Sequence, residues 1–446
     1  MAKSLDMTRG NPYALLIRFA LPLLAGNLFQ QLYNTVDCFI VGNYLGKEAL
    51  AAIGSTSQLV FTVIGFFMGL STGASVVISQ CFGAHDEERL RRVVHTTLLA
   101  TLLLGTVLSA AGFFVSPLML KLISVPADVF DKASEYLRIF FGGLIFLLIY
   151  NMGAGILRAV GDSKRPLIFL IASSVVNVVL DVVCIIGLGW GIAGAAYATV
   201  VAEAVAMALV LFVLVRTDEP YRVRVRELRI DRAITQKIIA LGLPGAVSSA
   251  LTAFSNTFMQ KYINVFGSAC IAGWASFAKF DQFAIMPMVS ISHSATTFVG
   301  QNYGAKNMAR VKQGMKSALV IGWLCMLVIP LLLFVCAEPL VSLFSRDADV
   351  IRYGAGFIRM TAPFYVLCCT TMLFSQTMRG LDSATIPTLI TFSTFVLMRQ
   401  LYLFVVTRFT TSFLPVAFAY PFSWFPSTVL SVLYYRWYTK KFLKNA

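Results

Sequence analysis

Residues 12–40 read PYALLIRFALPLLAGNLFQQLYNTVDCFI, an apolar stretch long enough to cross a lipid bilayer as a helix. Polar side chains fall on one face of that helix at helical spacing: Asn27, Gln30, Asn34 and Asp37. A carboxylate at mid-bilayer depth costs roughly 2.5 to 3.5 kcal/mol on insertion scales. We interpret this face as a functional site of a membrane carrier. The alternative is a satisfied hydrogen-bond network between helices.

Composition points to the same class of protein. The chain of 446 residues is 58% hydrophobic and 13% charged, with a mean hydropathy of +0.78, which excludes a water-soluble domain. We predict an all-α polytopic membrane protein with twelve transmembrane helices. The predicted spans are 12–40, 49–80, 93–116, 136–157, 166–188, 192–215, 238–266, 269–300, 315–336, 355–378, 386–407 and 413–436.

The net charge of +15 follows this topology. Of the 36 Lys and Arg residues, 24 lie on the side that holds both termini and nine lie in the opposite loops. This bias is the positive-inside pattern, so we expect both termini to be cytoplasmic, in the inner (plasma) membrane, and no nucleic-acid partner. The N-terminus runs into a span longer than the apolar core of a signal peptide, so we expect that span to be retained. The eight cysteines show no metal-ligand spacing.

The chain contains an internal repeat. Residues 80–84 (QCFGA) reappear as 301–305 (QNYGA), and 158–166 reappear as 379–387, both at an offset of 221 residues, whereas Pro22 is answered by Pro244 at 222. Six spans per copy is an even number, so both copies enter the membrane in the same direction. We predict two parallel six-helix bundles: residues 1–215, a cytoplasmic linker at 216–237, and residues 238–446, with the substrate cavity between them.

The two copies differ in their acidic residues. Asp37 corresponds to Met259 in the second copy, although Asn34 keeps its amide as Asn256. Asn177 and Asp181 lie four apart, on one helix face, and correspond to Met398 and Tyr402. We therefore expect Asp37, Asn177 and Asp181 to form one site in the first copy. Such a site could bind a sodium ion or share a proton, and the sequence does not distinguish between the two.

The duplicated motifs resemble those of the MATE (multidrug and toxic compound extrusion) family of the MOP flippase superfamily, over roughly residues 11–437. The residues that carry the resemblance are Ala20–Pro22, QQLYNTVD at 30–37, the two Gln-x-x-Gly-Ala loops and RAVGD at 158–162. It implies secondary active antiport by a rocker-switch mechanism: export of small organic, amphipathic or cationic compounds in exchange for H+ or Na+. It also implies that Asp37, with Asn177 and Asp181, is the coupling site and Pro22 a hinge. Further coupling-ion ligands are Asn34 and, by a looser match, Asn151.

The second copy departs from some members of that family. We find no acid within 238–266 or 355–378, so we expect coupling through the first copy alone. The second copy offers Lys279, Asp281 and Arg399 instead, either as structural ion pairs or as part of the substrate cavity. The residues that we assign to a possible substrate cavity are Gln30, Phe141, Tyr150, Asn256, Lys279, Asp281, Phe283 and Arg399.

Three classes of function are compared. The first is the ion-coupled exporter, acting as a monomer in the bilayer on small-molecule substrates without a cofactor. The second is a lipid-linked precursor flippase, which needs a more cationic cavity than Lys279 and Arg399 supply. The third is an enzyme, which the scattered histidines and the absence of an HExxH motif disfavour. The sequence leaves the substrate, the coupling ion and the roles of Glu203 and Asp281 open.

Overall fold

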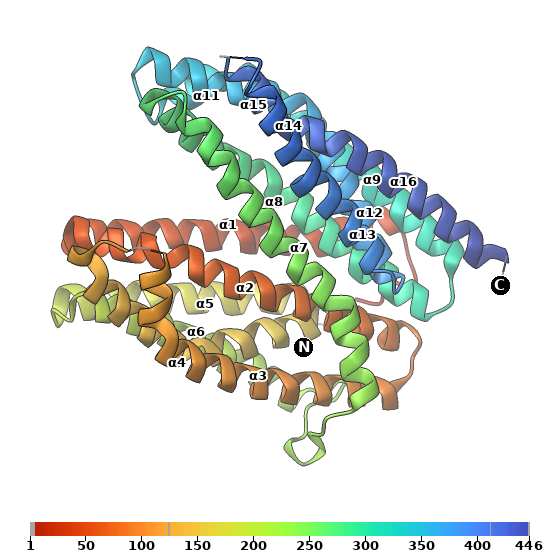
Figure 1. The fold of residues 1–446 in the computed structure, drawn as a ribbon. Helices are drawn as coiled ribbons and strands as arrows, with labels where there is room; N and C mark the ends of the chain where they lie inside the picture. The colour runs from red at the N-terminus through yellow and green to blue at the C-terminus, as the bar shows by residue number, and fades with distance from the viewer. Residues whose placement is uncertain (1–4, 124, 411, 445–446) are drawn as a thin grey trace. The chain divides into compact units, whose positions relative to one another are not determined.

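The computed structural model describes residues 5–123, 125–410 and 412–444, and every regular element in these ranges is a helix (Figure 1). The first half contains α1 (Pro12–Tyr44), α2 (Gly46–Gly83), α3 (Glu87–Leu122), α4 (Ala127–Ala159), α5 (Lys164–Asp181), the π-helix η1 (Val182–Gly187) and α6 (Gly191–Arg216). A short 3-10 helix, η2 (Val225–Glu227), lies in the connection to the second half.

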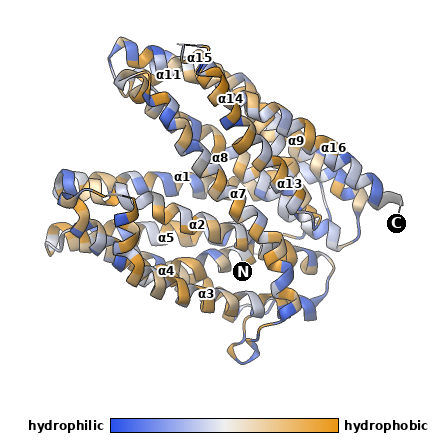
Figure 2. Ribbon diagram, in the orientation of Figure 1, coloured by the Kyte–Doolittle hydropathy of each residue, from blue (hydrophilic) through white to orange (hydrophobic). Residues whose placement is uncertain are grey.

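The second half contains more breaks. Its elements are α7 (Arg232–Asn264), α8 (Ser268–Gly304), α9 (Met308–Val335), α10 (Ala337–Ser342), α11 (Ala348–Thr361), η3 (Ala362–Phe364), α12 (Tyr365–Gly380), α13 (Thr385–Thr391), the π-helix η4 (Phe392–Met398), α14 (Arg399–Val406), α15 (Leu414–Ala417) and α16 (Ala419–Lys444). Hydrophobic residues dominate the helices, and hydrophilic ones gather at connections such as that between α6 and α7 (Figure 2).

Within the described ranges, eleven helical segments are long and apolar enough to cross a membrane. They correspond to eleven of the twelve predicted spans. The remaining prediction, 269–300, falls on α8, a continuous helix of 37 residues that is not among the eleven. Lys279, Asp281 and several serines and threonines make α8 less apolar than the others. The predicted fold class, an all-helical polytopic membrane protein, is confirmed.

The chain divides into two compact units. One is built mainly of Leu21–Gly242, and the other of Met7–Ala20 together with Leu243–Ala446. The first turns of α1 therefore belong to the second unit, and the first turns of α7 to the first unit. Both changes of unit fall next to a proline inside a helix, Pro22 in α1 and Pro244 in α7.

The internal repeat extends to backbone conformation. His85 and Lys306, 221 residues apart, both have positive φ, at 54° and 57°. The next residue in each loop caps the following helix: Asp86 accepts a 3.0 Å hydrogen bond from the backbone N–H of Arg89, and Asn307 does the same for that of Arg310. Each duplicated loop thus ends one helix and starts the next in the same way.

Each unit has one central helix. In the first unit α4 packs against α2, α3 and α6, and glycines allow the close approach. A Cβ added to Gly143 of α4 would lie 2.4 Å from a methyl group of Val200 on α6. In the second unit α8 packs against α9, α11 and α12. Helices α5 and α6 also pack against each other, and they carry Asp181 and Glu203.

Candidate functional site

Two carboxylates lie together in the first unit. Asp37 comes from α1, and Asp181 is the last residue of α5, fully buried, at the point where the α-helix passes into η1. Their side chains are close enough to share a hydrogen bond. Two ionised carboxylates offer only acceptors, so a hydrogen bond between them requires one proton. The pair can therefore hold one positive charge, such as this proton.

Within the described part of the chain, three of the four carboxylate oxygens of this pair have no hydrogen-bond donor. Oδ1 of Asp37 and both carboxylate oxygens of Asp181 are buried without a hydrogen-bond partner, and so are both Oδ1 and Nδ2 of Asn177. An unsatisfied buried polar group costs about 1–3 kcal/mol, more if it is charged. Native interiors seldom leave several together. A cation or a proton bound among these atoms would remove this cost.

The secondary structure explains how Asn177 and Asp181 reach the same place. They lie one turn apart on α5, so their side chains project from the same face. Beyond Asp181 the chain continues as a π-helix, a form that often marks a functional position in a helix. The donor set of two carboxylates and one amide oxygen fits a hard monovalent cation. Among the described residues, no three His, Cys, Asp or Glu side chains are grouped to hold a metal ion.

Sequence reasoning missed the tyrosines around the pair. Tyr136 of α4 and Tyr33 of α1 both lie within electrostatic range of Asp37 and Asp181. The Tyr136 hydroxyl also shares a hydrogen bond with Thr199 of α6. Tyr33 lies four residues before Asp37 on α1, a spacing that could have identified it. Tyr136 has no such signal, because it reaches the site from another helix.

Three other predicted coupling or hinge residues have different surroundings. Asn34 is half-buried on α1, three residues before Asp37. The amide of Asn151 donates a 2.9 Å hydrogen bond to the carbonyl of Leu147 on its own helix, and no contact with the acid pair is described for it. Pro22 lies inside α1, beside the change of unit.

The predicted cavity residues of the first unit are not grouped. Gln30 is exposed on α1. Phe141 is buried against α3, where its ring occupies the space beside Gly112. The Tyr150 hydroxyl donates a 3.2 Å hydrogen bond to the carbonyl of Pro166. The described contacts of Phe141 and Tyr150 are therefore packing contacts inside the unit.

In the second unit, Arg399 is the buried centre of a polar cluster that also includes the exposed Asn256. The Arg399 side chain is 1% exposed, and Nη1 donates a 3.1 Å hydrogen bond to Oδ1 of Asn256. Asp281 accepts a hydrogen bond from the hydroxyl of Tyr365 and also interacts electrostatically with Arg399. The sequence had suggested structural ion pairs among Lys279, Asp281 and Arg399 as one alternative, and Tyr365 was missed as a partner of Asp281.

The other two predicted residues of α8 lie outside this cluster. Lys279 and Phe283 are exposed. Of the two intramembrane cations expected near a substrate, Arg399 is thus engaged with protein groups and only Lys279 lies at the surface of the unit.

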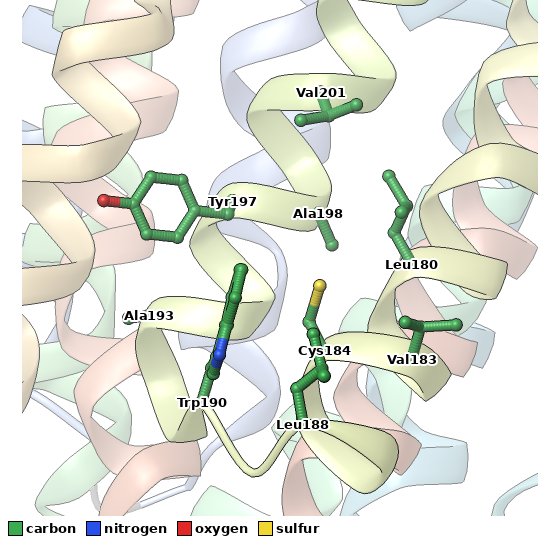
Figure 3. Close-up of a pocket in the computed structure, with 9 residues that line it drawn as sticks. All are labelled: Leu180, Val183, Cys184, Leu188, Trp190, Ala193, Tyr197, Ala198 and Val201. Atoms are coloured by element: carbon green, nitrogen blue, oxygen red, sulfur yellow. The ribbon is translucent and has the colours of Figure 1, made fainter.

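A hollow opens between the end of α5 and the start of α6 (Figure 3). Its volume is about 710 Å³, and it is lined by apolar side chains, among them Cys184, Trp190 and Tyr197. The Tyr197 hydroxyl points away from the hollow, and Trp190 is largely exposed (Figure 3). None of the described residues that line it is charged, so its chemistry suits an apolar chain and not an ion.

The chain is similar to known transporters over almost its whole length. The MatE family profile matches residues 22–183 and 244–403. The chain is 32% identical, over 435 residues, to the Bacillus subtilis (strain 168) "Probable multidrug resistance protein YoeA", with 95% of this chain and 93% of that protein covered. It is 26% identical over 350 residues to the "FAD transporter" of Shewanella oneidensis, with 77% and 76% covered.

Solved structures agree with this assignment. An outward-facing "multidrug resistance MATE family transporter of the MOP superfamily" superposes with a TM-score of 0.92 at 25% identity, covering 100% of this chain and 99% of that one. A MATE crystal structure in complex with MaL6 gives a TM-score of 0.93 at 24% identity. Transporters of this family are ion-coupled. The chain is therefore a multi-pass membrane protein that belongs to the MatE family of transporters, and it is not an enzyme.

Proposed function

We propose that this protein exports small organic, amphipathic or cationic compounds in exchange for H+ or Na+. The observation that carries the proposal is the acid pair: Asp37 and Asp181 within hydrogen-bonding reach, with three buried oxygens that lack donors in the described chain. A site of this kind is stable only with a positive charge in it. Its occupancy can therefore be coupled to a change of conformation.

Coupling would act through charge neutralisation. Binding of one cation or proton to Asp37 and Asp181 removes negative charge from the unit, which weakens the attraction for a cationic substrate and favours bending of α1 beside Pro22. A nearly complete shift between two states, from about 1:99 to 99:1, needs an affinity difference of about 10⁴-fold, roughly 5.5 kcal/mol. Several buried unsatisfied oxygens, at about 1–3 kcal/mol each, can supply most of it.

The substrate is assigned from chemistry and from relatives. YoeA is named as a multidrug resistance protein, which supports a broad organic substrate class. A relative is named as an FAD transporter, which supports testing an anionic compound as well as a cationic one. A lipid-linked precursor flippase is less well supported, because Arg399 is already engaged by Asn256 and Ser423.

We propose the topology predicted from the positive-inside bias, with both termini cytoplasmic in the plasma membrane, and a monomer as the functional form. The moving parts would be the lobes 1–215 and 238–446, joined by the linker 216–237. Alternating access by these lobes is the mechanism that we propose.

The test is efflux from proteoliposomes that contain the purified protein, driven separately by a pH gradient and by a sodium gradient. Ethidium would serve as a cationic probe and FAD as an anionic one. We expect wild type to export under one gradient, and Asp37→Asn and Asp181→Asn to lose that dependence. Efflux that persists unchanged in both variants would show that coupling does not use this pair.

A further inference from the structure

A second, smaller hollow lies in the first unit beside Glu203 of α6. It is bounded by Tyr33 of α1, by Ser173, Ser174 and Asn177 of α5, and by Glu203. It has room for about one water-sized body, which excludes an organic substrate. Oε2 of Glu203 is buried and, within the described ranges, has no hydrogen-bond partner. No Lys or Arg of the described chain forms an ion pair with Glu203 within 4.0 Å.

The hydroxyls of this hollow present acceptors. Ser173 and Ser174 both donate to the carbonyl of Leu170 on their own helix, at 3.0 and 2.8 Å. Each hydroxyl has one proton, so the lone pairs of both oxygens remain available. Asn177 is 2% exposed, and its Oδ1 has no donor among the described residues. The hollow therefore combines one carboxylate with several neutral oxygens, which is an environment for a cation.

The internal repeat offers a comparison, because the second unit holds a cation among residues that the 221-residue offset relates to lining residues of this hollow. The guanidinium of Arg399 lies 5.3 Å from the ring centroid of Phe395 and 4.4 Å from that of Tyr420. Its Nη2 donates a 2.9 Å hydrogen bond to Oγ of Ser423. Three residues from two helices thus surround a cation that the protein itself supplies.

The 221-residue offset relates those three residues to the hollow in the first unit. Phe395, Tyr420 and Ser423 correspond to Ser174, Thr199 and Ala202, and all three of these line the hollow beside Glu203. The first unit has Val178 in place of Arg399 and Glu203 in place of Trp424. It therefore lacks the fixed cation and has an acid there instead.

We propose that the hollow beside Glu203 is a second monovalent-cation site, and that it binds a sodium ion. Its ligands would be the Glu203 carboxylate, the hydroxyl oxygens of Ser173 and Ser174, and Oδ1 of Asn177. One carboxylate balances one positive charge, and an all-oxygen set suits a small hard cation. A site with a single carboxylate does not suit a divalent ion.

The hollow beside Glu203 lies close to the acid pair along α5. Asn177 lines the hollow, and it lies four residues, or about 6 Å along the helix axis, from Asp181. An ion leaving Asp37 and Asp181 toward the N-terminal end of α5 would reach Glu203 next. This role in transport rests on the proposed function, whereas sodium binding at Glu203 does not.

Equilibrium binding of radiolabelled sodium to the full-length protein in lipid nanodiscs tests the site. We expect Glu203→Gln to bind one sodium ion fewer than wild type, and Asp37→Asn to keep the Glu203-dependent ion. Ser174→Ala should weaken that component by about tenfold or more. Glu135→Gln is the matched control, because Glu135 is exposed on α4 and should leave binding unchanged.

Two outcomes would overturn the proposal. One is the same sodium stoichiometry in Glu203→Gln as in wild type. The other is a Glu203→Gln protein that loses a titrating proton but no sodium, which would make Glu203 a protonation site only. If Glu203→Gln does not fold, the double variant Ser173→Ala with Ser174→Ala decides. Failure of the proposed coupling would appear separately, as unchanged efflux in Asp37→Asn.

Discussion

Nη1 of Arg399 donates a 3.1 Å hydrogen bond to Oδ1 of Asn256, joining α14 to α7 inside the second unit. Arg399 is almost completely buried, but Asn256 is exposed, so water can replace part of the lost acceptor. We expect Asn256→Ala to lower the free energy of unfolding by about 0.5–1.5 kcal/mol, the range for a typical hydrogen bond. Thermal or chemical unfolding of the purified protein measures it.

The control for that variant is on the same helix. Asn264, at the end of α7, accepts a 2.8 Å hydrogen bond from Gln260; Asn264 is exposed and Gln260 is half-buried. Asn264→Ala should change stability by less than about 0.5 kcal/mol. Equal losses for the two variants would show that the Arg399 hydrogen bond contributes little.

Gly73 of α2 is a position where no side chain fits. A Cβ there would lie 2.6 Å from the backbone nitrogen of Gly242 and 2.6 Å from the carbonyl oxygen of Ile238, both in the first turns of α7. Backbone atoms cannot move aside as a flexible side chain can. We expect Gly73→Ala to destabilise the protein by about 1–3 kcal/mol, the typical cost of overpacking.

Gly54 provides the comparison, since a Cβ at this position of α2 meets nothing within 4 Å. Gly54→Ala should be neutral or stabilising by up to about 1 kcal/mol, because alanine is the better helix former. In the same detergent, Gly73→Ala should therefore have a lower melting temperature than Gly54→Ala. A Gly73→Ala variant as stable as wild type would mean that α2 and α7 separate without cost.

The sequence predicted the elements better than the contacts between them. Apolar run length located the helices, and the 221-residue offset paired the loops after Gly83 and Gly304, which the structure shows to have the same backbone conformation. Asn177 and Asp181 were placed on one face by helical spacing alone. These features depend on residues near one another in the chain, where period and composition carry the information.

Contacts between helices depend on rotation and packing, which one sequence does not encode visibly. Tyr136 reaches the acid pair from α4, and Tyr365 of α12 contacts Asp281 of α8. Nothing in the sequence around either tyrosine distinguishes it from the many other aromatic residues of the chain. The two π-helices, η1 and η4, also had no signal, although they adjoin Asp181 and Arg399.

The linker carries a pH-dependent contact. Glu227 accepts a 3.0 Å hydrogen bond from Nη1 of Arg224 and pairs with Arg91 of α3 at 3.3 Å, and these contacts hold the pKa of the Glu227 carboxyl below its usual range. A depressed pKa means that the contact stabilises the linker above the ordinary glutamate pKa of about 4.3 and is lost as pH falls below it. Hydrogen exchange of residues 217–231, corrected for intrinsic rates, should stay constant from pH 7 to about 5 and then rise.

Glu227→Gln reproduces the protonated state at neutral pH. We expect its linker to exchange or be cleaved by trypsin faster than wild type, by up to about fivefold, since partly exposed pairs are weak. Glu219→Gln, in the same linker, should behave as wild type. No difference between Glu227→Gln and wild type would show that Arg224 and Arg91 do not hold the linker through this carboxylate.

The acid pair should behave as one unit in mutation. In Asp37→Asn or Asp181→Asn, the new amide can donate to the remaining carboxylate, so each variant mimics the pair with one bound proton. We therefore expect both variants to fold at least as stably as wild type and to lose gradient-driven efflux. Either change already fixes the protonated form of the pair. The double variant should therefore lose no more efflux activity than either single variant.

Initial efflux rates from proteoliposomes, measured for wild type, both single variants and the double variant, give the coupling energy between the two residues. Asp128→Asn is the control, since Asp128 lies in the exposed first turn of α4. If the loss in the double variant equalled the product of the two single losses, Asp37 and Asp181 would act independently. In that case their side chains would not share one charge, and a separate ion or proton would have to be assigned to each.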